Sequence, residues 1–410
     1  MNHLYNIFIK LIDKIVLPIL EIFSKKIKRF KSNRVSLINT IANEIKVEGD
    51  RLWFHAASLG EYEMAVPLIK RIKEKHSFTI ILTFFSESGF QVKNRIKEVD
   101  YTFYLPLDTK ENAKNFINII KPKMAIFIRS EIWPNFLKEL KTRKIKTYLV
   151  ESTFTDDDKY LSFPLKYLYT NKLKMFSKIF TVDRKSKQVL NKIGLGNVVI
   201  SGSLKFERAV NLAKESYNNQ IIEKFKGNDF CVVCGSTWKE DEKMIFDYIK
   251  NFNNNIKWII APHDVSKNNI KRIKKNIHSN HLIYSDIDKN NVHGNILILN
   301  TIGHLKNIYK YADLSYVGGG MGNTGLHNIL EACVFKIPVV VGKNYKKFIE
   351  SIELVKLDGL ISVKNQNEFN NEINKLTTNQ KYRTYKINNI KKYFNTQTVA
   401  TNSIIKNLSL

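Results

Sequence analysis

The stretch YADLSYVGGGMGNTGLHNILEACVFKIPVVVG, residues 311–342, decides the fold class. A short apolar run, 314–317, ends in three successive glycines, and a helical pattern that opens near His327 leads into a second apolar run at 339–341. The order strand, glycine loop, helix, strand is typical of a βαβ unit in a parallel sheet. Glycine adopts positive φ and leaves backbone N–H groups uncovered, so the loop is expected to bind an anion such as a phosphate. An ordinary strand-to-helix turn is the competing interpretation.

Three polar residues follow the loop in the predicted helix. His327, Asn328 and Glu331 are spaced i, i+1 and i+4, which places His327 and Glu331 on one helix face within the first two turns. The positive end of the helix dipole favours an anion at this end. A carboxylate beside a bound phosphate suits a pair of sugar hydroxyls, so the segment predicts a nucleotide or sugar phosphate site.

Length and composition indicate a soluble α/β protein with more than one domain. The chain has 410 residues and a net charge of +28, and lysine supplies most of the positive charge. This charge favours anionic partners: membrane headgroups, phosphorylated substrates or nucleic acid. Three cysteines are too few for a disulfide framework and suit a reducing cytoplasm.

The N-terminal segment, 1–34, carries the one feature that resembles a targeting sequence. It is rich in Leu, Ile and Phe, but charged residues interrupt every apolar run before the length of about 20 residues that a membrane span needs. The pattern predicts an amphipathic helix in the membrane surface, followed by a lysine-rich and arginine-rich stretch over anionic lipid. A helix packed on the body of the protein is the alternative.

From residue 51 onward, short apolar runs alternate with amphipathic helical stretches. The first series closes at 198–203, a polar stretch at 211–228 reads as a linker, and the alternation restarts at residue 229. We therefore predict two doubly wound Rossmann-like domains, 35–210 and 229–410. Ligands of such sheets bind beyond the carboxyl ends of the strands, so two facing domains are expected to form one central cleft.

Polar residues that follow the predicted strands are the candidates for this cleft. The first domain supplies Ser58, Gly60, Glu61, Ser86, Ser88, Arg129, Glu131 and Lys205. The second domain supplies Gly235, Ser236, Thr237, His263, Thr301, Gly303 and the glycine loop with Gly319, Gly320 and Gly325. Glu61 stands at a predicted helix start, where the dipole stabilises a carboxylate, so it is either a helix cap or a catalytic group. Glu131 is either a helix-start acid or a substrate contact.

The ordered set of motifs resembles the Kdo transferases, where Kdo is 3-deoxy-D-manno-octulosonic acid. The resemblance covers roughly residues 50–345 and is carried by FHAASLGE (54–61), SEIWPN (130–135), GSLKFE (202–207), GST (235–237), APH (261–263) and GGG(x)6HNILEA (318–332). It implies a GT-B glycosyltransferase that moves Kdo from CMP-Kdo onto the lipid A precursor, lipid IVA, with inversion. It also implies a peripheral or monotopic location at the cytoplasmic face of the bacterial inner membrane, in lipopolysaccharide biosynthesis.

The resemblance also implies a role for each matching position. Glu61 would be the general base, with Glu131 as a second catalytic carboxylate. Among the strand-end candidates, acceptor contacts are expected from Ser58, Gly60, Ser86, Ser88 and Arg129. Donor contacts would come from Lys205, Gly235, Ser236, Thr237, His263, Gly319, Gly320, Gly325, His327, Asn328 and Glu331, with Glu331 on the ribose. Thr301 and Gly303 are expected to contact the donor as strand-end residues. No metal and no cofactor is expected, because the donor is a nucleoside monophosphate sugar and no cluster of metal ligands is evident.

The chain departs from the pattern of the family at several positions. Arg129 stands where the family commonly has the first acid of Glu-Thr-Glu, and Asp264 follows His263 where a proline is usual. Phosphate contact is therefore expected to shift to Lys205 or Lys267. The stretch 151–154 also differs, which affects the acceptor side more than the donor side.

Two other functions fit parts of the sequence. One is a GT-B enzyme of envelope synthesis that uses a UDP-sugar. The other is a non-catalytic basic protein that binds nucleic acid, but arginine is scarce and no arginine patch interleaved with aromatic residues is present. The expected partners are therefore CMP-Kdo, the lipid A precursor and an anionic membrane surface, with no nucleic acid.

Overall fold

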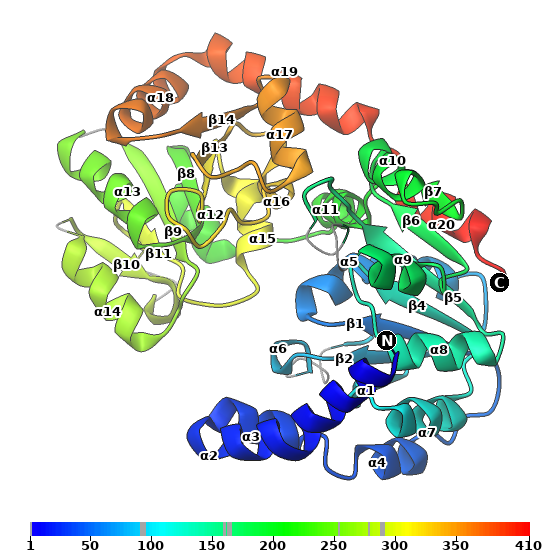
Figure 1. Cartoon of the computed structure of the whole chain (residues 1–410). Helices are drawn as coiled ribbons and strands as arrows, with labels where there is room; N and C mark the ends of the chain where they lie inside the picture. The colour runs from blue at the N-terminus through cyan, green and yellow to red at the C-terminus, as the bar shows by residue number, and fades with distance from the viewer. Residues whose placement is uncertain are drawn as a thin grey trace. The chain divides into compact units, whose positions relative to one another are not determined.

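The structure, a computed structural model, describes residues 2–90, 96–158, 161, 166–252, 255–277, 279–287 and 292–410, with only the backbone of residues 2, 3 and 88. The chain forms two compact units, coloured along the chain in Figure 1. Unit 1 comprises Met1–Arg208 with Thr398–Leu410, and unit 2 comprises Ala209–Gln397.

Unit 1 is built on a seven-stranded sheet in the order β3-β2-β1-β4-β5-β6-β7. Its strands are β1 (Arg51–Ala56), β2 (Thr79–Phe84), β3 (Tyr101–Tyr104), β4 (Met124–Ile128), β5 (Lys146–Ser152), β6 (Lys178–Thr181) and β7 (Val198–Ile200). All of its described strand pairs are parallel, with Leu52 opposite both Ile80 and Met124. The carboxyl ends of the strands therefore meet at one edge of the sheet.

Both faces of this sheet are buried because successive strand residues point in opposite directions. Trp53 and Phe127 belong to the core on one face, while Phe54 and Ile126 belong to the core on the other. The Trp53 ring packs edge-on against Phe127, with ring centroids 5.1 Å apart. Continuous apolar strands covered on both faces are the doubly wound arrangement that the sequence predicts.

Helices cover both faces. Those of unit 1 are α4 (Leu37–Glu44), α5 (Leu59–Lys73), α6 (Glu87–Phe90), α7 (Lys110–Ile120), α8 (Pro134–Thr142), α9 (Lys166–Leu173), α10 (Arg184–Lys192) and α20 (Ala400–Asn407), and α11 (Leu204–Lys214) runs across the boundary between the units.

The N-terminal segment is helical, as predicted, but it is broken into α1 (Asn2–Leu11), the π-helix η1 (Ile12–Val16), α2 (Leu17–Phe23) and α3 (Lys25–Ser32). Ser24 has an extended backbone, and its hydroxyl accepts a hydrogen bond from the amide of Ile27 at the start of α3. Helix α1 packs on unit 1, whereas Ile22 and Phe23 of α2 are 75% and 81% exposed. In the described part of the chain, no helix has both the length and the apolar character needed to cross a bilayer.

Unit 2 repeats the architecture with a parallel sheet in the order β10-β11-β9-β8-β12-β13-β14. Its strands are β8 (Phe230–Thr237), β9 (Ile256–Pro262), β10 (His281–Ile283), β11 (Ile296–Ile298), β12 (Leu314–Val317), β13 (Val339–Gly342) and β14 (Leu360–Val363). Its helices are α12 (Gln220–Lys226), α13 (Lys239–Asn251), α14 (Lys267–Asn276), α15 (Leu305–Ile308), α16 (Leu330–Cys333), α17 (Ile349–Lys356), α18 (Gln366–Thr378) and α19 (Gln380–Thr396), with 3-10 turns η4 (Tyr284–Asp286) and η5 (Tyr309–Tyr311). The predicted fold class, two Rossmann-like α/β halves, is confirmed.

The domain limits differ from the prediction in two places. The last helix, α20, belongs to unit 1, where Ala400 and Ile404 are buried and the Ser403 hydroxyl donates to the carbonyl of Ile200 at the end of β7 (Figure 1). The apolar side chains of α20 therefore belong to the same hydrophobic core as residues of β1, β2, β4 and β5. The expected linker, 211–228, contains α12, whose Ile222 and Phe225 are buried.

Candidate active site

Glu61 occupies the first turn of α5, immediately beyond the carboxyl end of β1. Its carboxylate accepts a hydrogen bond from the amide of Ala57, so it closes the start of the helix. Burial, and next the negative charge of Glu131, raise the pKa of Glu61 to about 7, although the Ala57 amide and Arg129 act in the opposite direction. Helix capping and acid–base chemistry, the two predicted interpretations of Glu61, are therefore both compatible with its position.

Glu131 is held beside this site by two ring nitrogens. The indole Nε1 of Trp133 donates to its carboxylate at 2.9 Å, and Nε2 of His55 lies 3.3 Å from the same oxygen. His55 is fully buried in β1, and its Nδ1 lies 2.9 Å from the hydroxyl of Thr83 in β2. This hydrogen-bonded cluster of Glu131, His55, Trp133 and Thr83 fixes the carboxylate whose negative charge acts on Glu61.

The sequence analysis missed His55, Thr83 and Trp133. His55 stands inside an otherwise apolar strand, and a buried polar ring needs hydrogen-bond partners. This position could have identified His55 as part of a polar cluster. Its partner Thr83 lies on the neighbouring strand, about 28 positions away along the chain, so only the strand pairing reveals it.

The predicted acceptor residues lie at the ends of adjacent strands. Ser58 precedes α5, Gly60 lies exposed in its first turn, and the amide of Ser86 donates to the carbonyl of Ala57 at 2.8 Å. Arg129 follows β4 in the left-handed region, with φ of 64°. The structure thus brings these residues together with Glu61 and Glu131. Ser88 lies in α6, and its side chain is outside the described part of the structure.

Lys205 lies in unit 1, in the first turn of α11, and not in the unit that carries the other predicted donor residues. The start of α11 already holds an anion: the buried carboxylate of Glu151 accepts from the Ser203 hydroxyl at 2.7 Å and from the amides of Leu204 and Lys205. Burial raises the pKa of Glu151. The chain's own carboxylate therefore fills this helix start.

In unit 2, the helix after the glycine loop begins later than predicted. The amide of His327 donates to the carbonyl of Gly318, and α16 starts only at Leu330, so His327 and Asn328 lie in the loop. The prediction that His327 and Glu331 share a helix face is therefore wrong. The loop is longer because the hydrogen bond to Gly318 folds it back on β12. The side chain of Asn328, which precedes the N-cap residue Ile329, accepts from the amide of Leu330 at 3.3 Å and donates to Glu331 at 3.0 Å.

The glycines of the loop are required by close backbone packing. Gly319 has φ of 88°, and a Cβ there would lie 2.0 Å from the carbonyl oxygen of Gly325. Gly320 lies against Gly342 of β13. A Cβ added at Gly342 would lie 2.3 Å from the backbone carbonyl carbon of Gly320.

The amide of Gly319 is not available to a phosphate. It donates at 2.8 Å to the buried carboxylate of Asp241 in α13, which also accepts from the Tyr316 hydroxyl at 2.7 Å and the Trp238 amide at 2.9 Å. The anion at this amide is therefore an internal carboxylate. This corrects the expected role of Gly319, whereas Gly320 and Gly325 remain candidates.

Three aromatic rings cluster beside the loop. His263, which is exposed at the end of β9, stacks on Trp238 and on His327, with centroids 4.6 Å apart in each pair. The Trp238 indole donates to Nε2 of His327 at 3.1 Å. Burial, and next His263, lower the pKa of His327 to about 4, so the ring is neutral at pH 7. Because Nε2 accepts, the proton resides on Nδ1, which can donate to a ligand.

The remaining donor candidates also lie at strand ends of unit 2. A Cβ at Gly235 would overlap the Tyr309 hydroxyl, and Ser236 has φ of 53°. Thr237 is 1% exposed, and its hydroxyl donates to Glu242 at 3.2 Å, so that hydroxyl is not offered to a ligand.

Thr301 and Gly303 lie beyond β11, in the turn before α15. The Thr301 hydroxyl is buried and has no hydrogen-bond partner in the described part of the chain, and Gly303 is exposed with φ of 94°. A buried hydroxyl without a partner is costly, which favours a ligand contact at Thr301.

Several known proteins to which this chain is similar are Kdo transferases. Residues 26–208 match the family model for 3-deoxy-D-manno-octulosonic-acid transferase (kdotransferase). The chain is 28% identical to a 3-deoxy-D-manno-octulosonic acid transferase of Aquifex aeolicus over 341 residues, covering 80% of this chain and 87% of that protein. It is 25% identical to a bifunctional glycosyltransferase/methyltransferase of Fusobacterium nucleatum over 376 residues, covering 88% of this chain. It spans only 57% of the length of the Fusobacterium protein.

A similar solved structure is the UDP-GlcNAc 2-epimerase of Neisseria meningitidis bound to UDP-GlcNAc. The TM-score is 0.61 at 14% identity, over 87% of this chain and all of that one. This likeness concerns the fold: two Rossmann-like halves in one chain. The family model over residues 26–208 and several curated relatives at 23–28% identity show that this chain is similar to Kdo transferases.

Proposed function

We propose that this protein transfers Kdo from CMP-Kdo to a hydroxyl of the lipid A precursor, lipid IVA, with inversion at the anomeric carbon. The observation that carries the proposal is the half-buried Glu61. Its pKa is raised to about 7, in part by the charge of Glu131, whose carboxylate is held by the Trp133 indole. A general base is most effective when its pKa is near the working pH, and an ordinary glutamate is far from that condition. Similarity to Kdo transferases supports Kdo as the donor sugar.

In the proposed reaction, Glu61 accepts the proton of the acceptor hydroxyl as its oxygen forms a bond to the anomeric carbon of Kdo. The bond between that carbon and the phosphate oxygen of CMP breaks, and CMP leaves with the electron pair. Attack on the face opposite the leaving group inverts the configuration. Glu131 is proposed to keep the pKa of Glu61 high, and its contacts with Trp133 and His55 hold it in place for this purpose.

The nucleotide is proposed to bind at the strand ends of unit 2. His327 offers its Nδ1–H, because Trp238 occupies Nε2. Glu331, oriented by the amide of Asn328, is proposed to accept the ribose hydroxyls. The backbone of Gly320 and Gly325 is proposed to stabilise the departing phosphate. A phosphate contact by Lys205 stays a prediction from the sequence.

We also propose that the protein is bound peripherally at the cytoplasmic face of the bacterial inner membrane. Helices α1 and α2 expose a row of apolar side chains, namely Leu4, Ile7, Phe8, Leu11, Ile19, Ile22 and Phe23. Helix α3 follows with Lys25, Lys26, Lys28, Arg29 and Lys31, which suit an anionic lipid surface. Deleting residues 1–30 should release the protein from membranes, and retention in the membrane pellet would show that the anchor lies elsewhere.

The decisive test is a transfer assay with purified full-length protein. CMP release and the mass of the lipid product are measured with CMP-Kdo and lipid IVA, and nucleotide release is measured in parallel with UDP-sugars. Release of CMP together with a lipid heavier by one or more Kdo residues supports the proposal. Release of UDP instead would identify the alternative GT-B enzyme of envelope synthesis.

A pair of variants on α5 tests the assigned base. Glu61→Gln should abolish transfer while CMP binding persists, because the amide cannot accept the proton. Glu63→Gln is the matched control, since Glu63 lies on the same helix two residues away. Turnover by Glu61→Gln near the parental rate would place the base elsewhere.

A further inference from the structure

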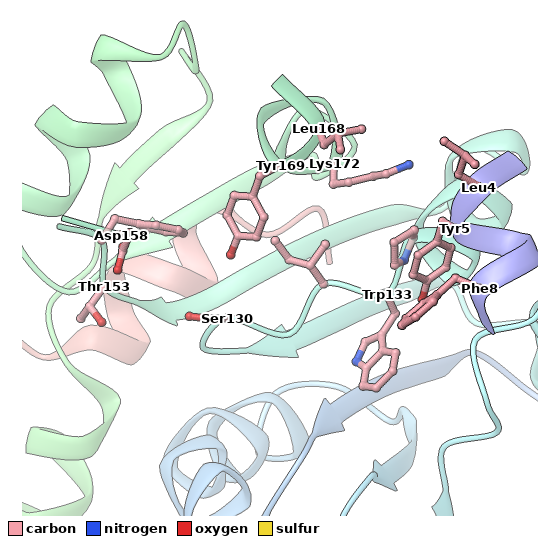
Figure 2. A pocket seen from close by; sticks show the side chains of 13 residues that line it. Leu4, Tyr5, Phe8, Ser130, Trp133, Thr153, Asp158, Leu168, Tyr169 and Lys172 are labelled. Atoms are coloured by element: carbon pink, nitrogen blue, oxygen red, sulfur yellow. The ribbon is translucent and has the colours of Figure 1, made fainter. Parts of the chain in front are cut away.

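A large cavity in unit 1 has no role in the reaction described above. Its volume is about 850 Å³, which lies in the range of roughly 300–1,000 Å³ typical of small-molecule pockets. Figure 2 shows two helices on its sides: α1 contributes Leu4, Tyr5 and Phe8, and α9 contributes Leu168, Tyr169 and Lys172. The cavity therefore lies under the N-terminal helix and within one unit.

The lining is mostly hydrophobic. Ile132, Trp133, Pro134 and Phe154 supply the wall between the two helices. A sugar or nucleotide would leave most of its hydroxyls unpaired against such a wall, at a cost for each buried polar group. An extended hydrocarbon chain meets no such penalty, so the chemistry of the lining favours an acyl chain.

Two neighbours of the proposed catalytic carboxylate Glu131 line the cavity. Ser130 and Trp133 line it, and they flank Glu131, whose carboxylate accepts from the Trp133 indole. A chain in the cavity would therefore belong to a molecule whose polar part lies at the carboxyl ends of β1 and β4.

The cavity is also continuous with the exposed apolar row of the N-terminal helices. Leu4 and Phe8 line it and are nevertheless 69% and 58% exposed. These side chains face the hollow and the solvent at once. A chain in the cavity can therefore continue along the surface that we propose to lie in the lipid.

The wall formed by α1 is held by specific buried contacts. The Tyr5 hydroxyl donates to Asp108 at 2.7 Å, and the side-chain amide of Asn135 donates to the side-chain oxygen of Asn6 at 2.8 Å. Asp108 also accepts from the amides of Asn135 and Phe136 at the start of α8. Helix α1 is thus held beside the cavity by side-chain hydrogen bonds to Asp108 and Asn135. An amphipathic helix that bound only to a lipid surface would not need such bonds.

We propose that this cavity binds one acyl chain of the acceptor lipid, running from the Glu131 region toward Leu4 and Phe8. The assignment rests on the proposed function for the identity of the acceptor, and on the cavity alone for the presence of an acyl-chain site. It makes the acceptor specificity a matter of hydrocarbon contact as well as of sugar and phosphate recognition.

Binding of single-chain probes tests the cavity without any transfer reaction. Glucose, hexyl glucoside and octyl glucoside, each below its micelle concentration, are titrated into the full chain by isothermal calorimetry. Burial of each methylene group should tighten binding about fourfold, so octyl glucoside should bind about 16-fold more tightly than hexyl glucoside. Glucose should not bind measurably. Equal affinities for the two glucosides would overturn the proposal.

Two variants of α9 locate the probe. Leu168→Trp places a larger ring in the cavity and should weaken octyl glucoside binding at least tenfold. Tyr167→Trp is the matched control, because Tyr167 is the neighbouring residue, is 68% exposed and does not line the cavity. Equal affinity in both variants would assign the probe to the exposed face of α1 and α2. The chain-length series in the parental protein keeps the test valid if Leu168→Trp does not fold.

A transfer assay separates this proposal from the proposed function. Leu168→Trp should raise the KM for lipid IVA and leave transfer to a fully deacylated acceptor unchanged. If the parental protein transfers Kdo but Leu168→Trp behaves like the parent with lipid IVA, the acyl-chain site is wrong and the enzyme assignment stands. If no Kdo is transferred while the probes bind as described, the enzyme assignment is wrong and the cavity assignment stands.

Discussion

Removing the charge of Glu131 should move the pH profile of the enzyme toward lower pH. Glu131→Gln keeps an oxygen that can accept from the Trp133 indole but removes the negative charge beside Glu61. That charge is one of the causes that raise the pKa of Glu61 from 4.5 to about 7. The base should therefore ionise at lower pH in the variant.

The size of this effect follows from the two causes of the raised pKa. Burial is the larger cause and persists in the variant, so the pKa of Glu61 should fall only part of the way toward 4.5. For carboxylates in one partly buried site, removing a like charge lowers a pKa by about 1, which corresponds to about 1.4 kcal/mol. At pH 6, the ionised fraction of Glu61 would then rise from roughly one tenth to roughly one half.

The assay is the pH dependence of kcat/KM between pH 5 and 8.5, with each profile normalised to its own plateau. Normalisation removes any loss of absolute rate, so the position of the acid limb reports the pKa of the base in the free enzyme. Arg129→Gln is the opposing control: the Arg129 charge lowers the pKa of Glu61, so its removal should move the limb to higher pH. An acid limb that stays in place in both variants would refute the electrostatic coupling to Glu61.

Three further predictions concern stability and binding. Because burial raises the pKa of Glu61, the fold has its full stability below pH 4.5, where this group is protonated, and loses part of it as pH rises through about 7. Glu61→Gln should therefore stabilise the fold by about 1–2 kcal/mol at pH 8 and by less at pH 5. Thermal unfolding at the two pH values measures this difference. Tyr5→Phe removes the hydrogen bond to Asp108 and should cost about 1–2 kcal/mol and speed proteolysis of the N-terminal helix; unchanged cleavage would show that this bond does not hold α1. Gly319→Ala places a Cβ 2.0 Å from a carbonyl oxygen of the loop and should weaken CMP binding at least tenfold, whereas Gly196→Ala, with open space around its Cβ, should bind CMP like the parent.

The sequence alone determined the two sheets and the principal carboxylates. The strands are mainly short apolar runs, and their pattern is local, so alternation with helical stretches predicts a parallel sheet without any knowledge of distant contacts. Glu61 and Glu131 could be nominated for the same reason. In a parallel sheet, residues that follow different strands lie at one edge, whatever their separation along the chain.

The tertiary structure decided which groups are already occupied. The Asp241 carboxylate accepts a hydrogen bond from the amide of Gly319 because β8 and β12 are neighbours in the sheet. The two residues are 78 positions apart, so no sequence periodicity predicts this contact. The carboxylate of Glu151 takes the start of α11 in the same way. A glycine loop or a helix start predicts an anion, but the sequence does not say whether a ligand or the chain itself supplies it.

The tertiary structure also decided the later start of α16 and the presence of the acyl-chain cavity. The helical spacing of His327 and Glu331 is real in the sequence, yet the hydrogen bond from His327 to Gly318 keeps that residue in the loop. The cavity needs α1 to be held against α8 and α9, which depends on the partly buried hydrogen bond from Tyr5 to Asp108. Local patterns determine which elements form, whereas contacts between distant elements determine which of their polar groups remain available for a substrate.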